Sequence, residues 1–347
     1  MGEFIMKLAD THVHLENIEY GRVEGFFDEL YKNGVTDATI LALCSFHNYH
    51  TAQNLIALSW KERYKKINLR AFGSFHETDF YRDVPYEKQL LKMLSLGIDG
   101  VKFIQMKPDA RKNNGKGVNH PAYDRAFSIM EERGTPVLIH SGDPENLWNK
   151  GEEYDDPSFL HFEEIYNEDF EMLDKHPRLN VTFAHFFFLS NQPDRVEKIF
   201  DKYPNVKFDL TPGWEMFIGF SKDIKRWQGI FDTYSDRILY GTDSNTRKNF
   251  NTAIRDLVVG ALTHDETEFQ MPCYGGHTIR GLDLSEKTFN KIFYENYLNF
   301  VGKSPAPVNK SGLIESAERM LSDLKNVKGE EKSVSWLFDF LKREKQI

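Results

Sequence analysis

Two histidines near the start of the chain, His12 and His14, have a spacing suited to binding one ligand together. They lie in residues 10–14 (DTHVH), in a run of apolar and β-branched residues that predicts a strand. Because alternate residues of a strand point to the same face, both imidazoles can approach the same atom. The pair alone is weak support, because about 0.4 such pairs are expected by chance in a chain with 12 histidines.

Three more residues suited to metal binding or proton transfer follow predicted strands elsewhere in the chain. His140 and His185 each end a short apolar run, and Asp243 follows another. Imidazole nitrogens and a carboxylate oxygen suit zinc or a similar divalent ion, with a position left open for water. If the fold brings these side chains to His12 and His14, the sequence predicts a metal site.

The spacing of the apolar runs predicts the elements that would bring these residues together. Short runs recur about every 30 residues, each followed by a polar loop and a helical pattern. Eight such units predict an α/β fold, a closed (β/α)₈ TIM barrel; the alternative is an open doubly wound sheet, but no Gly-rich fingerprint follows the first strand. The expected strands are 7–15, 38–45, 68–75, 100–105, 136–140, 181–187, 206–210 and 237–241.

Three helical patterns follow the eighth unit, each beginning near a serine that can cap its first turn. We expect them to form a C-terminal helical extension that packs on the barrel rather than a second domain. The expected organisation is a single domain over 7–347, with about 263–347 as loop and helical extension. Residues 1–6 would lie outside it, with Met6 as a candidate natural start. The expected helices are 23–32, 51–64, 87–96, 121–133, 162–175, 194–203, 222–234, 251–262, 285–301, 311–324 and 333–344.

The composition excludes several classes of protein. With 40% hydrophobic and 28% charged residues, the chain is neither a disordered protein nor a disulfide scaffold. Its net charge of −9 argues against a general nucleic-acid binder, and no apolar run approaches the roughly 20 residues that span a bilayer. Two distant cysteines and the lack of a signal-peptide core predict a cytoplasmic protein. The expected partner is a small-molecule substrate, with no nucleic acid and no membrane.

Five motifs, in order along the chain, resemble the amidohydrolase superfamily. Within it they are similar to the amidohydrolase-related group that includes aminocarboxymuconate semialdehyde decarboxylase-like enzymes. The resemblance runs from about residue 7 to residue 300. It implies a distorted TIM barrel with one divalent metal ion, most often zinc, with manganese or another divalent ion as the alternative, and often a homodimer. The motifs are residues 10–14, 100–102, 136–140, 181–185 and 239–243.

The resemblance also implies roles for individual residues. His12, His14 and His140 would bind the metal, and Asp243 would be a ligand or the proton carrier. His185 would act as a general acid or base near the reacting water. A lysine falls on the fourth strand, where two-metal members of the superfamily carry a carbamylated lysine. In this group a lysine there is common without that role, so an ion pair or a contact to a substrate carboxylate is expected instead.

Loops on the same face of the barrel supply candidate contacts to a substrate. Arg247 could hold a carboxylate through two hydrogen bonds, although a solvated loop arginine is an equal alternative. The long segments 141–158 and 263–283 are lid candidates. His47, His76 and Glu215 also follow strands, and the two histidines are more often loop or core residues than ligands. The candidate substrate-binding residues are Lys102, Arg247, Trp214, Trp148 and His277.

The chain departs from the family pattern after the histidine of the sixth strand. Phe186, Phe187 and Phe188 stand where the family usually has small residues. If they continued the strand, their alternating side chains would narrow one wall of the site, while plain strand packing is the alternative. The substrate of the better-known family members therefore does not carry over to this chain.

The chemistry expected from these residues is metal-assisted hydrolysis of a small-molecule amide, lactone or ester. Asp243 or His185 would accept the proton of the attacking water and return it to the leaving group. Non-oxidative decarboxylation of an aromatic or enoic carboxylic acid is the alternative at the same site. A non-catalytic barrel that binds a metabolite is the alternative from another class.

Overall fold

In the computed structural model, the described residues include nine strands that form one parallel sheet and two more that form a separate antiparallel pair. The structure describes residues 7–44, 46–47, 49–213, 215–248, 250, 252–265, 268–271 and 277–345. The strands are β1 (Leu8–His14), β2 (Val35–Leu41), β3 (Asn68–Gly73), β4 (Gly100–Met106), β5 (Val137–Ser141), β6 (Val181–Phe183), β7 (Val206–Asp209), β8 (Ile238–Leu239), β9 (Ser244–Asn245), β10 (Glu268–Met271) and β11 (His277–Arg280).

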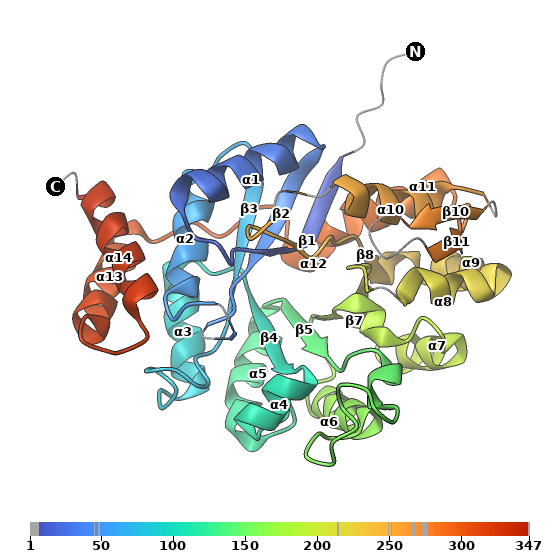
Figure 1. Cartoon of the computed structure of the whole chain (residues 1–347), viewed down its shortest axis with the longest axis horizontal. Helices are drawn as coiled ribbons and strands as arrows, with labels where there is room; N and C mark the ends of the chain where they lie inside the picture. The colour runs from blue at the N-terminus through green and yellow to red at the C-terminus, as the bar shows by residue number, and fades with distance from the viewer. Residues whose placement is uncertain are drawn as a thin grey trace.

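The parallel sheet closes on itself through an interrupted last strand. Its order is β8-β7-β6-β5-β4-β3-β2-β1-β9. β8 pairs with β7, and β9, which follows β8 after four residues, pairs with β1. The two short segments together are the eighth strand of a barrel, which helices surround (Figure 1). The (β/α)₈ barrel predicted from the sequence is confirmed, and so is the contact between its eighth and first strands.

The helices follow the strands in the order that the sequence indicated. α5 and α6 have the predicted bounds, and two short helices, α4 and α8, were not predicted because each is only seven residues long. None of the described helices is both long enough and apolar enough to cross a bilayer. The helices are α1 (Tyr20–Lys32), α2 (Gln53–Arg63), α3 (Tyr86–Leu96), α4 (Pro108–Asn114), α5 (Pro121–Arg133), α6 (Phe162–Lys175), α7 (Pro193–Lys202), α8 (Met216–Lys222), α9 (Ile224–Thr233), α10 (Thr252–Thr263), α11 (Glu286–Asn290), α12 (Asn296–Val301), α13 (Lys310–Leu324) and α14 (Glu331–Glu344).

One end of the barrel is sealed by α12. Tyr297 and Phe300 of this helix pack in one buried cluster with alanine, leucine and phenylalanine side chains in or beside the barrel strands. The amide of Asn296 donates to the carbonyl of Ile238, at the start of β8, and Asn180, just before β6, donates to the carbonyl of Phe300. Because these contacts lie where strands begin, α12 closes the N-terminal end of the barrel and leaves the C-terminal end open for chemistry.

The C-terminal extension is a pair of helices, α13 and α14, that packs against α2 and α3 (Figure 1). Lys310 forms an ion pair with Glu62 at 2.8 Å. The hydroxyl of Tyr81 donates to Asp323 at 2.9 Å. The predicted helical extension of the barrel is therefore confirmed.

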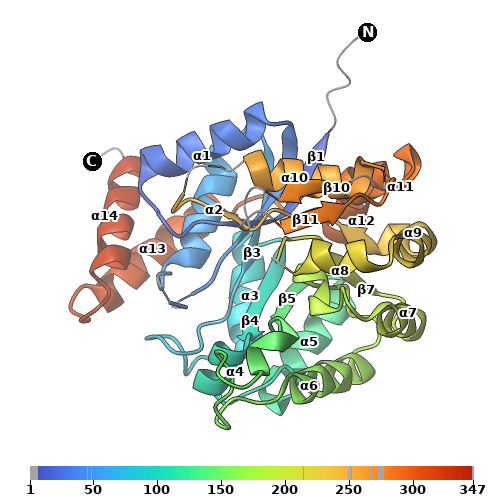
Figure 2. The same ribbon diagram turned by 45° about the vertical axis from the view of Figure 1, so that its right-hand side comes forward.

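The segment 263–283, expected as a long loop, instead contains the hairpin of β10 and β11. The hairpin packs beside α8, and Figure 2 shows it between α8 and α10. The backbone amide of Arg280 donates to the hydroxyl of Ser221 at 2.9 Å. Polar and apolar residues alternate in β10, and this alternation was the available signal for it.

The buried carboxyl group of Asp169, on α6, supports the end of β5 and makes stability depend on pH. It accepts a hydrogen bond from the hydroxyl of Ser141. Burial raises the pKa of Asp169 well above its usual range. The folded chain therefore keeps a proton that the unfolded chain releases near pH 4, so the free energy of unfolding falls as the pH rises above about 4.

We expect Asp169→Asn to remove this dependence on pH. Relative to the wild type, the variant should gain roughly 1.4 kcal/mol for each pH unit between about 4 and the pKa of folded Asp169. Urea unfolding of both proteins at about pH 5 and about pH 7 measures the difference. Equal changes with pH in the two proteins would contradict the prediction.

Candidate active site and metal centre

β1 places His12 and His14 side by side at the C-terminal end of the barrel. Both side chains are buried, and their ring centroids lie 5.0 Å apart. The register between β1 and β2 shifts between Asp10 and Val13, and Thr11 there donates from its backbone amide and its hydroxyl to the carbonyl of Tyr240. This contact ties the bulge in β1 to the gap in the eighth strand.

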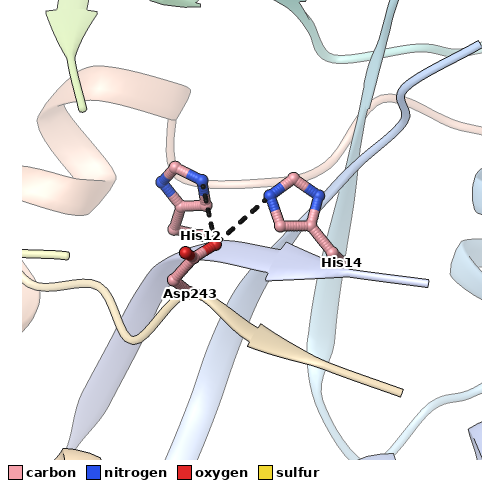
Figure 3. A group of neighbouring side chains, drawn as sticks. All are labelled: His12, His14 and Asp243. Carbon is pink, nitrogen blue, oxygen red and sulfur yellow. Dashed lines mark ion pairs between the residues drawn. The ribbon is translucent and has the colours of Figure 1, made fainter. Parts of the chain in front are cut away.

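The gap between β8 and β9 presents Asp243 to both histidines. Its Oδ1 atom lies 3.5 Å from Nε2 of His12 and 3.4 Å from Nε2 of His14. Figure 3 shows both rings pointing toward this carboxylate. Asp243 has a φ of 54°, which is unusual for a residue other than glycine. The turn is held by Thr242, whose amide and hydroxyl donate to the carboxylate of Asp10 at 3.1 and 2.6 Å.

His185 and His140 extend the same cluster. Nε2 of His185 lies 3.2 Å from Nδ1 of His140, and the rings of His185 and His12 are 5.5 Å apart between centroids. Both side chains are buried. The structure therefore places His12, His14 and Asp243 together, as predicted, while His140, the fourth predicted ligand, reaches them only through His185.

The three phenylalanines after His185 do not continue β6, which ends at Phe183. Residues 185–188 form a turn with φ between 52° and 57°, so their side chains do not alternate as in a strand. Phe186 and Phe187 are fully buried in the core behind the barrel. Phe188 alone faces the site, with its ring stacked on His185 at 5.2 Å and 5.7 Å from His140.

Each of the four clustered histidines uses one ring nitrogen to contact an oxygen acceptor. These contacts hold the protons of the neutral imidazoles on the nitrogens concerned. The remaining nitrogens of the four rings therefore carry lone pairs. The contacts are His12 Nδ1 to Asp209 Oδ2 at 3.0 Å, His14 Nδ1 to the Leu41 carbonyl at 3.2 Å, His140 Nε2 to Asp143 Oδ1 at 3.3 Å, and His185 Nδ1 to the Thr211 carbonyl at 3.2 Å.

This pattern of lone pairs fits a bound cation. Two of the lone pairs meet between His140 and His185, and the other two face the carboxylate of Asp243. Acceptors that face one another without a hydrogen between them are costly unless a cation lies among them. One donor atom from each of His12, His14 and Asp243 lies within 4.8 Å of the other two. His140 is outside that group in the described part of the chain and joins it through His185.

Burial keeps the imidazoles of the cluster neutral. Burial lowers the pKa of His14 and His185 to about 3 and that of His140 to about 4. Lys102, from β4, is also buried, and its Nζ lies 3.5 Å from Nε2 of His12. Burial lowers its pKa to about 8, against the attraction of carboxylates that include Asp243. Lys102 therefore lies inside the cluster, against a predicted ligand.

Asp243 is the part of the cluster that is open to the mouth of the barrel. About 41% of its side chain is exposed, in contrast to the buried histidines. The recess around it still limits its hydration, and this desolvation raises the pKa of Asp243 to about 7, opposed chiefly by Lys102. A substrate entering from the mouth therefore meets this carboxylate before the imidazoles.

Sequence reasoning missed the carboxylates that orient the histidines. Asp209 ends β7 and, besides contacting His12, accepts a hydrogen bond from the backbone amide of His185 at 2.9 Å. Asp143 lies three residues after His140 and binds Lys107 and the hydroxyl of Tyr154, each at 2.5 Å. The sequence did offer a signal for Asp209, because it is a carboxylate at the end of the expected seventh strand. Four other expected strands end in the selected histidines or are followed by Asp243.

The residues predicted to contact a substrate do not lie together in the structure. Arg247 is an exposed residue at the rim, paired with Glu16 at 3.4 Å. The indole of Trp148 donates to the carbonyl of Leu160 at 2.9 Å and packs on Tyr154, so it holds the 141–158 loop together. Trp214, the side chain of His277 and residues 1–6 lie outside the described residues.

Glu215, noted in the sequence only as a polar residue after the seventh strand, is a buried acid. Both of its carboxylate oxygens are buried, and neither has a hydrogen-bond partner among the residues that the structure describes. Burial raises its pKa to about 7, with the charge of Asp143 adding to the effect. His47 is exposed and pairs with Asp109 at 2.7 Å.

We expect Asp209→Asn to weaken metal binding by roughly 10- to 100-fold, because an uncharged amide holds the Nδ1 proton of His12 less firmly and no longer raises the basicity of that ring. Titration with zinc against a competing chelator measures the affinity. Asp256→Asn, which alters an exposed carboxylate paired with Arg255, is the control. Equal zinc affinity in Asp209→Asn and the control, with both proteins folded, would contradict the role given to Asp209.

A protein-family model and several solved structures are similar to this chain. A family model described as Amidohydrolase matches residues 83–299. A search of curated protein sequences gives no significant match. Similar solved structures include 2,6-dihydroxybenzoate decarboxylase from Rhizobium, with a TM-score of 0.54 and 13% identity, covering 85% of this chain and 98% of that one.

Two further structures share the fold. 4-Oxalomesaconate hydratase from Rhodopseudomonas palustris has a TM-score of 0.53 and 10% identity, covering 92% of this chain and 100% of that one. Dihydroxybenzoic acid decarboxylase from Polaromonas sp. JS666, with bound manganese and the inhibitor 2-nitroresorcinol, has a TM-score of 0.52 and 12% identity, covering 85% of this chain and 97% of that one. Because the family model matches more than half of the chain, this protein belongs to the amidohydrolase family and is an enzyme of the amidohydrolase superfamily.

Proposed function

We propose that this enzyme uses one divalent metal ion to hydrolyse a small-molecule amide, lactone or ester. The observation that carries the proposal is the convergence of His12, His14 and Asp243 at the mouth of the barrel, with the lone pairs of both imidazoles facing the carboxylate. The three side chains would hold the ion, and zinc is the ion that this donor set suits best. When bound, the ion supplies Lewis-acid activation of a water molecule and of a substrate carbonyl.

The residues of the chain have separate tasks in this proposal. Asp243, the exposed member, accepts the proton of the attacking water and returns it to the leaving group. His185 presents Nε2 as a hydrogen-bond acceptor, because its Nδ1 contacts the carbonyl of Thr211. Phe188 stacks on His185 and excludes water from that side. The buried ammonium group of Lys102 stabilises negative charge that develops beside His12.

Decarboxylation of an aromatic or enoic carboxylic acid is the second candidate reaction. It is supported by the two decarboxylases of dihydroxybenzoic acids among the similar structures, one of them with bound manganese. In this reaction Lys102 would balance the charge of the substrate carboxylate, and Asp243, when protonated, would deliver a proton to the carbon that loses carbon dioxide. The ring of Phe188 offers an aromatic surface for such a substrate.

Product analysis separates the two reactions. The enzyme loaded with zinc or with manganese is incubated with aryl esters, lactones and N-acyl amino acids, and in parallel with hydroxybenzoic acids. Acid release identifies hydrolysis, and release of carbon dioxide identifies decarboxylation. Hydrolysis that depends on the added metal supports the proposal.

Release of carbon dioxide without hydrolysis would replace the proposal with the second candidate. A ligand that binds without turnover, and that binds equally well to His12→Ala, would replace it with a metabolite-binding barrel.

A further inference from the structure

A cavity of about 700 Å³ lies between the rim of the barrel and the C-terminal helix α14. One wall is the segment after β1, from Glu16 to Tyr20, together with Arg247 after β9. The other wall is α14, where the guanidinium group of Arg343 lies over the ring of Tyr20, 4.9 Å from its centroid. Figure 2 shows α14 beside α1, which begins at Tyr20. Cavities of this size are typical of sites for small molecules.

A second cavity, of about 490 Å³, joins the first to the candidate metal centre. Glu16 and Arg247 line both cavities, and Tyr49 lines the second. The ring of Tyr49 lies edge-on to the ring of His14, with 5.8 Å between the two centroids. A path therefore leads from a predicted metal ligand, past Tyr49 and Arg247, to α14. Sequence reasoning selected Arg247 on this path, but neither Tyr49 nor any residue of α14.

The wall formed by α14 is long. The residues that line the cavity are spaced by three or four positions, so they lie on one face of the helix. They are Lys332, Ser335, Trp336, Asp339 and Arg343. From the first to the last of them the helix rises by about 16 Å, a length that an extended peptide covers with about four or five residues. A substrate with a single ring would leave most of this cavity empty.

Charges of both signs line the cavity beside α14. Glu16 and Arg247 pair with each other at 3.4 Å. The remaining charged side chains form no ion pair within the described part of the chain; they are Glu19, Lys332, Asp339 and Arg343. A hydrocarbon chain is disfavoured here because it would take these charges out of water. A ligand with negative charge alone would be repelled by the two acids. The lining therefore favours a polar ligand that carries charges of both signs.

We propose that the two cavities together are the substrate site and that the substrate is a short peptide, or a peptide-like amide, of about four or five residues. This inference rests on the proposed hydrolysis, because it names the kind of amide that is cleaved. Tyr49 and Arg247 contact the residues next to that amide, and α14 contacts the residues beyond them. The water oxygen bonds to the carbonyl carbon, the carbon–nitrogen bond breaks, and one proton of the water goes to the leaving nitrogen.

A peptide matches the lining of the cavity in charge as well as in length. A peptide with free ends carries one carboxylate and one ammonium group. Lys332 and Arg343 offer cations to the carboxylate, and Asp339 offers a carboxylate to the ammonium group. Ile18 and Tyr20 add apolar surface for peptide side chains.

Binding is tested with dialanine, tetraalanine and hexaalanine as probes and isothermal titration calorimetry as the readout. The zinc-loaded Asp243→Asn protein is used, because Asp243 lines neither cavity and its replacement is expected to slow cleavage. Tetraalanine should bind roughly tenfold more tightly than dialanine, because it reaches α14, and hexaalanine should gain little more. Equal affinity for the three peptides would overturn the proposal.

Ser335→Trp fills the cavity on the side of α14. Ser335 is exposed and lines the cavity, so the larger side chain enters the cavity without disturbing the core. This variant should bind tetraalanine roughly tenfold more weakly, as weakly as dialanine, and its affinity for dialanine should not change.

The matched control is Phe338→Trp, which places a tryptophan on the same helix but outside the cavity. Phe338 is 60% exposed and does not line the cavity. This variant should keep both affinities. If the two variants bind tetraalanine equally well, the proposal is overturned. The comparison of peptide lengths in the parent protein does not depend on either variant being folded.

A separate assay distinguishes this inference from the proposed function. The zinc-loaded wild type is incubated with the same peptides and with aryl esters, and cleavage is followed by the release of amino groups or acid. Affinity that increases with peptide length, without cleavage of any compound, keeps the peptide site and overturns the proposed hydrolysis. Cleavage of aryl esters together with affinity that is independent of peptide length keeps the hydrolysis and overturns the peptide site.

Discussion

Replacing His14 by alanine is expected to remove the metal ion from the purified enzyme and, with it, the activity. The imidazole supplies one of the three donor atoms that lie within 4.8 Å of one another, and the other two donors do not hold an ion alone. The loss of affinity should exceed the roughly 100-fold that follows from losing an outer hydrogen-bond partner. Metal analysis of protein purified without chelator measures the metal content per chain.

His161→Asn is the matched control for that experiment. His161 is exposed and caps the first turn of α6 by accepting from the amide of Glu163, a task that asparagine also performs. This variant should keep the metal content of the wild type. Full metal content in His14→Ala would show that the ion binds elsewhere and would remove the basis of the proposed function.

Asp243→Asn is expected to lower kcat by roughly 10²- to 10⁴-fold, the range typical for the loss of a general acid or base. The amide oxygen of asparagine can still contact the ion, so the metal content should fall much less than in His14→Ala. The amide cannot accept the proton of the water, and this is why the chemical step should suffer. Steady-state kinetics with the substrate found by product analysis, together with metal analysis, test both parts.

The two variants together separate metal binding from proton transfer. Activity that falls only in proportion to metal content in Asp243→Asn would make Asp243 a ligand and nothing more. His185 would then be the candidate base, because its Nε2 lone pair lies in the same cluster. Ser244→Ala, beside Asp243 in β9, is a control for local disturbance of the turn.

The barrel and the pairing of His12 with His14 were predictable from the sequence because both depend on local patterns. Parallel strands covered by helices read as short apolar runs, and eight such runs at a regular spacing leave few other folds. The face shared by His12 and His14 follows from the alternation of a single strand. The family motifs then fixed the order of His140, His185 and Asp243 around the barrel.

The interruption of the eighth strand could not be predicted from the local sequence pattern. The expected strand 237–241 is reduced to β8, and pairing with β1 resumes only at β9, after a gap that holds Asp243 at a positive φ. Hydrogen bonds from Thr242 to Asp10 hold that gap. The turn at Phe186 and Phe187 is similar: neighbours from other elements enclose these rings, and that packing belongs to no local pattern.

The sequence by itself determined the eight strand–helix units of the barrel and the histidines and aspartate that end their strands. Only the tertiary structure decided which ring nitrogens carry lone pairs, because the acceptors that fix the protons come from other strands and loops. His12 and Asp209, for example, are 197 residues apart and 3.0 Å from each other. Such contacts depend on the register between distant strands, which local periodicity does not encode.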